Sequence, residues 1–440
     1  MHIQIETGPV GDGPLGGELE AELHRVGHDS TEGADLEPHT LHAAARGVLA
    51  HRIDNALRDR HLVQFCPALR APMILTIGPR LVGHNGAYDL RVTDTLGDGD
   101  VAALRDWVRE QGIGSQLTDV TPLAGGTQNI VVRLRIDGRP MVLRRPPEHP
   151  RPTSNKTMLR EIAVLRTLAG TAVPHPEFIA GCDDLAVLGV VFYLMAEVDG
   201  FNPGNEVSYA YAREETMRHR VGLHFAQSLA LLGNAPWEGS ELAAIKRPGS
   251  FVARQVPQWR GVLDSYRRQE GYPADSLPGV DELADWLAAN RPADSAPGIM
   301  HGDVHLNNVL LRRDRPEVAA FVDWEMCTVG DPLLDLGWLL ICWPVDPDPL
   351  GVGAPLASLG GLATRQELLH AYLGAGGRST AHLDWYQALA CFKLGVVLEG
   401  SWVRMRAGQA IREVGERLHA SARRLIELGS QVAEGKDPFG

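Results

Sequence analysis

The stretch of chain around residues 301–336 limits the possible folds more than any other part of the sequence. It contains the loop His301-Gly-Asp-Val-His-Leu-Asn-Asn308, which runs directly into the apolar residues 309–311. A second apolar run, residues 319–322, is followed by Asp323-Trp-Glu325. Two short apolar runs joined by a polar turn are typical of a β-hairpin, so we expect 309–311 to pair with 320–322. Such a hairpin would bring Asp303, Asn308 and Asp323 together.

These three side chains are the kinds of groups that phosphoryl transfer requires. One carboxylate, here Asp303, would orient and deprotonate an attacking hydroxyl, while Asn308 and Asp323 would supply oxygen ligands to the Mg²⁺ that neutralises the phosphates. An Asp followed five residues later by an Asn is common by chance, but the whole set of loop, strand and Asp-Trp-Glu is much rarer. The alternative is a capped loop whose carboxylates are solvated or structurally paired. We favour phosphoryl transfer.

The sequence upstream predicts a small half that is rich in β-strands. A helix over residues 98–111 precedes the glycine-rich turn Leu123-Ala-Gly-Gly-Thr-Gln-Asn129 and a strand over 130–136. Asp137-Gly138 is a strong signal for a two-residue hairpin, so residues 140–145 should return as the partner strand. A helix over 155–168 and a buried strand over 187–195 follow, and the rest is largely helical. This outline predicts an α+β, two-lobed, protein-kinase-like fold.

We expect three parts in the chain. Residues 1–91 form an N-terminal extension, residues 92–196 a nucleotide-binding N-lobe, and residues 197–440 a helical C-lobe with the catalytic loop and the acceptor site. The extension holds 8 of the 17 histidines, no lysine and many Gly and Pro residues. Two interpretations of it are open: a poorly ordered or accessory segment, or a start-site artefact with the natural start near Val92. We slightly favour the artefact.

Composition argues against several classes of partner. A formal net charge of −13 disfavours nucleic acid. Apolar stretches such as 187–196 and 336–343 fall well short of the ~18 residues that cross a bilayer, and no secretory signal is recognisable. The five scattered cysteines lack metal-ligand spacing and fit reduced thiols. We therefore expect a cytoplasmic protein that contacts neither nucleic acid nor membrane, and the oligomeric state stays open.

The stretch 301–336 resembles the aminoglycoside phosphotransferase family. That family's signature joins the His-Gly-Asp loop and its Asn to an Asp-x-Glu motif and to Gly-Asp-Pro-x-x-Asp-Leu, which is present here as Gly330-Asp-Pro-Leu-Leu-Asp-Leu336. The likeness covers roughly residues 98–412, and it looks closest to the branch that includes the kinase-like domains joined to acyl-CoA dehydrogenases in animals. The resemblance implies that the γ-phosphate of ATP is transferred, with Mg²⁺, to a hydroxyl of a small-molecule acceptor.

The resemblance also implies roles for individual residues. Asp303 would be the catalytic base, Asn308 and Asp323 the magnesium ligands, and Glu325 a further metal or second-shell residue. His301 and Asp335 would support the loop without taking part in the chemistry, and the role of His305 stays open. The choice between ATP and GTP is open as well.

The nucleotide side departs from the usual kinase pattern in one respect. The residues expected to contact the nucleotide are Gly125, Gly126, Thr127, Asn129, Arg144, Glu161, Met195, Ala196 and Val198. Kinases usually carry a phosphate-binding lysine on the third strand, whereas strand 140–145 offers only Arg144 and Arg145. Strand alternation puts Val142 and Arg144 on one side, so we expect Arg144 to replace the lysine, with Glu161 as its partner. The alternative is that both arginines are surface charges on an edge hairpin.

The acceptor is less constrained. Residues 254–260 and 393–406, expected on the acceptor side, carry five basic residues and one acidic residue. A basic wall suits an anionic or neutral acceptor such as a hydroxyacyl-CoA, although these residues could equally lie on solvated helix faces. Trp259 and Trp402 are candidate walls of the acceptor pocket or, alternatively, core residues.

Three other functions remain as alternatives. One is an aminoglycoside-inactivating kinase, and another is a catalytically silent, nucleotide-binding homologue. A protein kinase is disfavoured because the metal motif reads Asp-Trp-Glu in place of Asp-Phe-Gly, and no Ala-Pro-Glu follows it.

Overall fold

The computed structural model describes residues 96–123, 129–147, 150–344 and 355–439, together with the backbone of two short strands, β1 (Gln64–Phe65) and β2 (Pro72–Met73). The predictions made for residues 1–91 therefore lie almost wholly outside the described residues. Gly125, Gly126 and Thr127 also lie outside them. Within the described part of the chain, no helix combines the length and apolar character needed to span a membrane.

The β-rich part is a five-stranded antiparallel sheet in the order β3-β4-β5-β7-β6. Its strands are β3 (Leu117–Pro122), β4 (Ile130–Ile136), β5 (Arg139–Arg145), β6 (Phe178–Cys182) and β7 (Phe192–Ala196). The predicted hairpin joins β4 to β5: Asp137 and Gly138 both have positive φ, 48° and 77°. Positive φ at both central residues is the geometry of a type I′ turn, which matches the twist of the flanking strands.

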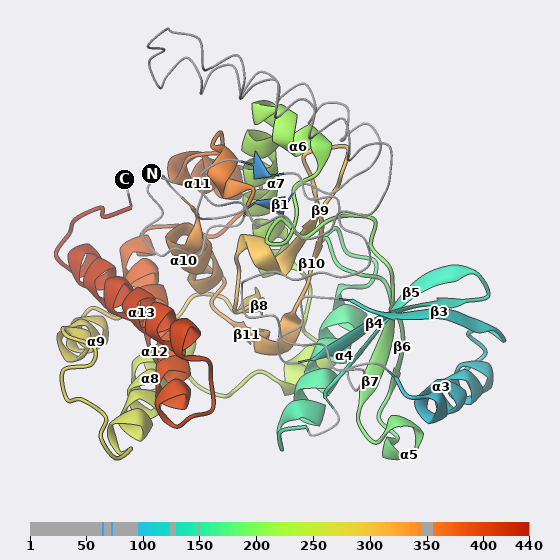
Figure 1. Ribbon diagram of the computed structural model, residues 1–440. Coiled ribbons are helices and arrows are strands. Elements are labelled where there is room, and N and C mark those ends of the chain that lie inside the picture. The colour runs from blue at the N-terminus through green and yellow to red at the C-terminus, as the bar shows by residue number, and fades with distance from the viewer. Residues whose placement is uncertain are drawn as a thin grey trace, which may run out of the picture. The chain divides into compact units, whose positions relative to one another are not determined.

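The two faces of this sheet pack against different helices (Figure 1). On one face, Leu143, Phe192 and Leu194 share a core with α3 (Asp98–Glu110), where Trp107 meets Phe192 edge to face at 4.9 Å. The other face turns to α4 (Ser154–Leu168), because Tyr193 joins the core that contains the apolar side chains of α4. Strand alternation accounts for the division, since successive residues point to opposite faces.

The larger part of the chain is helical, and its fold class is the one predicted. Its helices are α6 (Tyr209–Arg213), α7 (Glu215–Asn234), α8 (Phe251–Arg267), α9 (Val280–Ala289), α10 (Leu333–Cys342), α11 (Arg365–Gly374), α12 (Leu383–Arg406) and α13 (Arg412–Ala433). A short helix, α5 (Leu185–Leu188), belongs to the sheet part. Helices α12 and α13 lie side by side, and α10 and α8 also pack on α12 (Figure 1). The two-lobed α+β prediction is confirmed.

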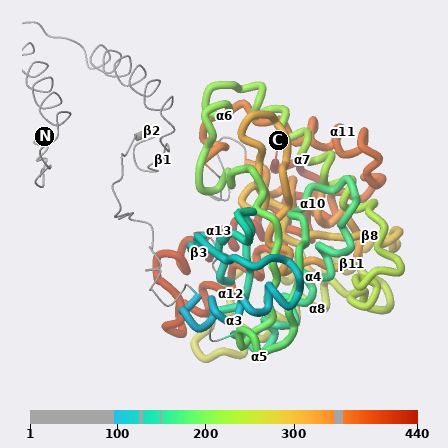
Figure 2. The backbone as a smooth tube through the Cα atoms, turned by 90° about the vertical axis from the view of Figure 1, so that its right-hand side faces the viewer, coloured from blue at the N-terminus to red at the C-terminus, as the bar shows by residue number. Residues whose placement is uncertain are grey.

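Two small antiparallel sheets hold the stretch 298–330 in the helical part. Strand β9 (Val309–Leu311) pairs with β10 (Val318–Phe321), which is the predicted hairpin, with Val309 opposite Phe321. Strand β8 (Gly298–Met300) pairs with β11 (Thr328–Gly330), and the two lie side by side in both views (Figures 1 and 2). The loop 301–308 leaves β8, and Asp323 follows β10, so both sheets deliver candidate site residues to one place.

Close packing of β8 on α7 leads to a first prediction, for Gly298→Ala. A Cβ at Gly298 would lie 2.1 Å from the backbone oxygen of Gly233, so strand or helix must shift. We expect the free energy of unfolding to fall by about 1–3 kcal/mol, as for other overpacked sites.

The matched control is Gly261→Ala, in the exposed middle of α8, where a Cβ would meet nothing within 4 Å. This change should raise stability by about 0.5–1 kcal/mol through helix propensity. Urea unfolding of both variants provides the measurement. Equal stability of the two would contradict the close approach of β8 to α7.

Candidate active site

The loop that follows β8 is held from beneath by buried charges. The Asp335 carboxylate accepts hydrogen bonds from the backbone N–H groups of His301, at 2.5 Å, and Gly302, at 3.0 Å. The Lys393 Nζ donates to the carbonyl oxygen of Gly302 at 3.0 Å. Gly302 has φ 86°, and a Cβ there would lie 2.4 Å from the oxygen of Met326, so the position requires glycine. These contacts fix the backbone that carries Asp303.

Lys393 shows that one expectation about the acceptor side was wrong. The residue is only 6% exposed, and its ammonium lies 4.4 Å from the centre of the Trp338 ring, in addition to its bond to Gly302. A lysine so enclosed supports the loop and does not form part of an exposed basic wall. Arg254 and Arg260 are also engaged within the protein, Arg254 with backbone carbonyls of residues 248–250 and Arg260 with Asp285.

Asp303 is paired with neighbours of its own loop. The Asn308 Nδ2 donates to an Asp303 carboxylate oxygen and to its backbone oxygen, both at 2.9 Å. The His305 Nε2 lies 3.4 Å from the other carboxylate oxygen. Burial favours the neutral carboxyl, but the hydrogen bond and charge of His305, with more distant help from His301 and Lys393, lower the pKa of Asp303 to about 2. Asp303 is therefore ionised at neutral pH, and its side chain stays 29% exposed.

Asp323 lies beside this loop in an unusual backbone conformation. Its φ of 66° is in the left-handed region, which residues other than glycine seldom occupy. The residue before it is tied to the loop twice, because the Val322 N–H donates to the Asn308 oxygen at 3.0 Å and the Val322 oxygen lies 2.9 Å from the His301 Nε2. The Asp323 side chain is 39% exposed. Its carboxylate is thus partly exposed to solvent.

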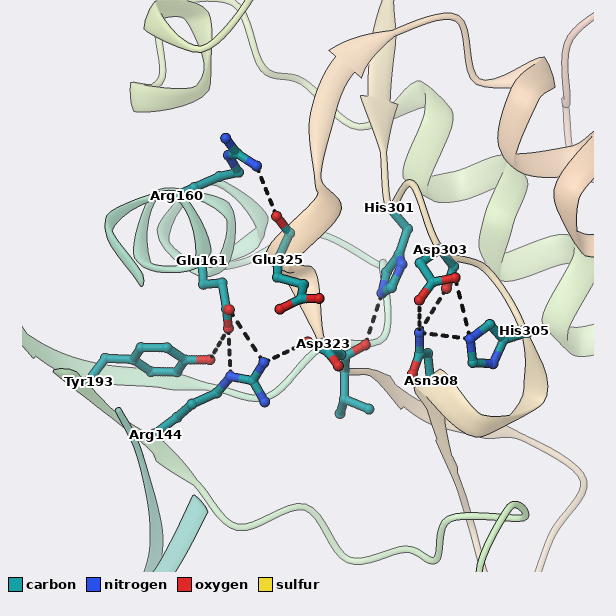
Figure 3. A network of polar contacts seen from close by, with 11 residues as sticks. Arg144, Arg160, Glu161, Tyr193, His301, Asp303, His305, Asn308, Asp323 and Glu325 are labelled. Atoms are coloured by element: carbon teal, nitrogen blue, oxygen red, sulfur yellow. Dashed lines mark hydrogen bonds and ion pairs between the residues drawn. The ribbon is translucent and has the colours of Figure 1, made fainter. Parts of the chain in front are cut away.

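A line of buried polar groups connects Asp323 to the sheet (Figure 3). The Arg144 guanidinium contacts Asp323 through Nη2 at 2.6 Å and Glu161 of α4 through Nε at 2.9 Å. The Tyr193 hydroxyl donates to the same Glu161 oxygen, Oε2, at 2.8 Å. Burial disfavours the charged guanidinium, but Glu161 in the first place, then Tyr193 and Asp323, raise the pKa of Arg144 above its ordinary value.

The sheet topology rules out the alternative interpretation of the two arginines. Strand β5 lies in the centre of the sheet, and Arg144 and Arg145 are 8% and 5% exposed, so neither is a surface charge on an edge hairpin. They point to opposite faces, as alternation predicts: Arg144 meets Glu161, and Arg145 meets Asp100 of α3. The predicted pairing of Arg144 with Glu161 is present.

Two contributors to this network were not assigned a role from the sequence. Tyr193 lies directly opposite Arg144 across β5 and β7, on the same face of the sheet. Arg160, next to Glu161 on α4, donates to the backbone oxygen of Glu325 at 2.8 Å. Only the register between β5 and β7 places Tyr193 next to Arg144, and no local sequence pattern encodes that register.

The remaining expected nucleotide residues lie around the same face. Met195 is opposite Val142, two pairs along from Tyr193 and Arg144, and therefore shares their face, whereas Ala196 alternates to the other face. Val198 is half-buried just after β7, and Asn129 is half-buried just before β4. The structure thus brings Met195 near the Arg144 network. Ala196, Val198 and Asn129 lie at or next to the ends of β7 and β4, and their predicted contact with the nucleotide stays a prediction.

The oxygen groups present fit a magnesium ion. The Asn308 Nδ2 is turned to Asp303, which leaves the amide oxygen on the opposite side of the group, and Asp323 offers a half-exposed carboxylate. Burial, followed by the negative charge of Asp323, raises the pKa of Glu325 to about 7. A neighbouring cation would relieve this concentration of negative charge.

No ready-made metal cage is gathered, however. In the described ranges no group of three or more His, Cys, Asp and Glu side chains is placed to hold a metal ion. That suits Mg²⁺, which nucleotide-binding enzymes hold by one or two carboxylates together with phosphate oxygens.

A β-sheet lobe with a buried Arg–Glu pair, and a helical lobe with an Asp–Asn loop and a following Asp, define a phosphotransferase of the kinase-like class. The chain belongs to the phosphotransferase enzyme family, whose sequence model (APH) matches residues 119–386. Membership confirms both the resemblance and the enzyme class predicted from the sequence.

Curated relatives include acyl-CoA dehydrogenase family member 11 of Gallus gallus, 28% identical over 323 residues that cover 72% of this chain and 40% of that protein. Family member 10 of Mus musculus is 26% identical over 70% of this chain and 28% of its own length. The chain therefore spans less than half the length of these relatives.

Among solved structures, a Ralstonia eutropha protein named provisionally as an aminoglycoside phosphotransferase is 26% identical, with a TM-score of 0.61, covering 75% of this chain and 98% of that one. A type I macrolide 2′-phosphotransferase, 20% identical with a TM-score of 0.50, covers 74% of this chain and 97% of its own and shows the shared fold.

The contact between Tyr193 and Glu161 leads to a second prediction, for Tyr193→Phe. Glu161 is completely buried and loses one of its donors, so we expect the free energy of unfolding to fall by about 1–3 kcal/mol. Because Glu161 positions Arg144, we also expect the Kd for Mg·ATP to rise several-fold, measured by calorimetric titration.

The control for this prediction is Tyr211→Phe, which removes another buried hydroxyl that donates to the Arg315 oxygen at 2.9 Å. It should lower stability similarly and leave the Kd for Mg·ATP unchanged. If both variants shift the Kd equally, Tyr193 has no specific role in placing Arg144.

Proposed function

We propose that this protein transfers the γ-phosphate of ATP to a hydroxyl of a small-molecule acceptor, with Asp303 as the catalytic base. The observation that carries the proposal is the Asp303–Asn308 pair, because one amide both fixes the base through Nδ2 and leaves its oxygen for a metal ligand. Asp303 has a pKa of about 2, so it is ionised and can accept a hydrogen bond from the acceptor hydroxyl; it would take the proton as the hydroxyl oxygen bonds to phosphorus.

Magnesium and nucleotide would bind between the two groups of residues already described. Asn308 and Asp323 would hold Mg²⁺, with Glu325 close by, and the ion would neutralise the charge of the phosphates. Arg144, held by Glu161, would bind phosphate oxygens in place of the usual lysine. The turn with Gly125, Gly126, Thr127 and Asn129 would offer N–H groups to the phosphates, and the segment with Met195, Ala196 and Val198 would contact the rest of the nucleotide.

For the acceptor we propose a hydroxyacyl-CoA. Support comes from the names of the curated relatives, which are acyl-CoA dehydrogenase family members. A second support is charge: four arginines and one glutamate lie in residues 267–272 and 403–407, at the ends of α8 and α12. Such a surface is poorly suited to a polycationic aminoglycoside.

The free, buried thiols of Cys182, Cys327 and Cys391 are consistent with the cytoplasmic location that we propose.

The test is an acceptor screen with Mg·ATP that spans hydroxyacyl-CoA compounds, aminoglycosides and small alcohols. We expect phosphate transfer to a hydroxyacyl-CoA compound. Transfer to aminoglycosides alone would contradict the proposed acceptor and identify the protein as an aminoglycoside kinase. The Asp303→Asn variant should lose about 10³-fold in kcat and keep its affinity for Mg·ATP, because it removes the base alone. Retention of more than about a tenth of the activity would remove Asp303 from this role.

The same framework predicts a different result for Asp323→Ala. This variant loses a proposed metal ligand, so the Kd for Mg·ATP should rise by about tenfold or more, a cost of about 1.4 kcal/mol per tenfold. Chelation of Mg²⁺ should weaken nucleotide binding to the wild-type protein in the same way. Calorimetric titration measures both, with Asp303→Asn as the control that retains affinity. An unchanged Kd in Asp323→Ala would contradict the metal assignment.

A further inference from the structure

A second candidate binding site lies at the C-terminal ends of α8 and α12. It is a cavity of about 170 Å³ lined by Gln269, Glu270, Tyr272, Val403, Arg406 and Ala407. Helix α12 connects it to the catalytic loop, since Lys393 bonds to Gly302 and Val403 follows ten residues later. At a rise of about 1.5 Å per residue, the cavity begins about 15 Å along the helix from the loop. The distance is too long for a small alcohol and suits an extended acceptor.

The aromatic wall of the cavity is fixed by a buried carboxylate. Glu399 is completely buried, and it accepts hydrogen bonds from the Tyr272 hydroxyl at 2.8 Å and the Ser276 hydroxyl at 2.5 Å. Its other oxygen lies 2.6 Å from the His419 Nδ1 of α13. Three partners from two segments satisfy one buried carboxylate, so Tyr272 is held in place before any ligand arrives.

The position of Arg406, the basic residue that lines the cavity, depends on His419 and therefore on Glu399. The His419 ring stacks on Trp402 with a centroid distance of 4.5 Å and an interplanar angle of 17°. The Arg406 guanidinium lies 4.9 Å from the centre of the Trp402 ring. A cation over an indole face is held there by the ring quadrupole, so Arg406 is oriented at the cavity by Trp402. Tyr272 is thus held by Glu399 directly, and Arg406 is held by Glu399 through His419 and Trp402.

The charges around the cavity select the kind of ligand. Of the charged residues in 267–272 and 403–407, Arg406 and Glu270 line the cavity, and Arg267 is already paired with Asp281. The Arg406 guanidinium, which lies over the Trp402 ring, is suited to bind phosphate. Glu270 and Gln269 line the same cavity and can accept hydrogen bonds from hydroxyl or amino groups. A phosphorylated nucleoside presents both kinds of group.

Helices α8 and α12 lie together along the whole distance from the loop to the cavity. Lys393 is 5.7 Å from the centre of the Trp259 ring, and a Cβ at Gly400 would lie 2.5 Å from the Tyr266 hydroxyl. We propose that the cavity binds the phosphate-bearing nucleotide end of the acceptor, while the hydroxyl at the other end of the acceptor lies at Asp303. This assignment rests on the proposed function and specifies where a CoA ester would be held.

The test uses adenosine 3′,5′-bisphosphate, the nucleotide end of CoA, as a probe. It is titrated into the full chain in the presence of Mg²⁺ and a saturating non-hydrolysable ATP analogue, which fills the ATP site. We expect binding, and a rise of about tenfold in the Kd for the probe in Arg406→Gln.

The matched control is Arg404→Gln, two residues away on α12, whose guanidinium is exposed and bonded to Ser401 and does not line the cavity. It should bind the probe like the wild type. Absence of probe binding, or an equal effect of both variants, would overturn the proposal.

Kinetics separate this inference from the proposed function. With the acceptor that the screen identifies, Arg406→Gln should raise the KM for acceptor about tenfold and leave the kcat and the KM for ATP unchanged. Transfer with an unaltered acceptor KM in Arg406→Gln would overturn the cavity assignment and leave the kinase intact. Probe binding that depends on Arg406, without transfer to any acceptor, would uphold the cavity and overturn the proposed reaction.

Discussion

The buried guanidinium of Arg144 is the interaction on which the arrangement of the site depends. A charge that is 10% exposed must be compensated nearby, and here the compensation comes from Glu161 on α4 and Asp323 after β10. Removing one partner of a buried pair typically costs about 3–5 kcal/mol, because the other charge is left without its counter-ion. The same α4 also holds the Glu325 backbone through Arg160. Two consecutive residues of one helix therefore fix both ends of the proposed metal-binding segment relative to the sheet.

A second set of buried charged residues, Asp335 and Lys393, holds the backbone of the loop that carries Asp303. The Asp335 carboxylate satisfies two backbone N–H groups that would otherwise be buried without acceptors, and Lys393 satisfies the carbonyl of the same turn. This explains in physical terms why Gly330-Asp-Pro-Leu-Leu-Asp-Leu336 accompanies the His-Gly-Asp sequence. Its second Asp sits in the first turn of α10, where it reaches the loop. These bonds restrain the loop backbone from both sides.

Local patterns were sufficient for much of this arrangement. The spacing of apolar runs predicted the β9–β10 hairpin, Asp137-Gly138 predicted the β4–β5 turn, and alternation chose Arg144 over Arg145 as the residue on the Glu161 face. What failed required long-range information. Lys393 looks like an exposed helix cation until α10 and the catalytic loop are placed around it.

Tyr193 illustrates the same limit. It is an ordinary buried strand residue until the register between β5 and β7 sets it opposite Arg144. Glu399, similarly, acquires its partners from segments more than a hundred residues away and from the next helix. Alternation assigns a face to each side chain, whereas register and helix packing decide what lies on that face.

The geometry of Arg144 is compatible with the proposed replacement of the phosphate-binding lysine by arginine. An ammonium is a single point of charge, whereas a guanidinium presents donors on separate nitrogens in a fixed plane. In Arg144, Nε lies 2.9 Å from Glu161, whereas Nη2 lies 2.6 Å from Asp323 and only 3.4 Å from the second Glu161 oxygen. Nη2 could therefore exchange the exposed Asp323 carboxylate for another anion while the guanidinium stays with the buried Glu161. Tyr193 makes that division more secure, since it holds the Glu161 oxygen that faces Nε. The larger cation would thus keep its contact with α4 while its outer partner changes, as the phosphate-binding role proposed for Arg144 requires.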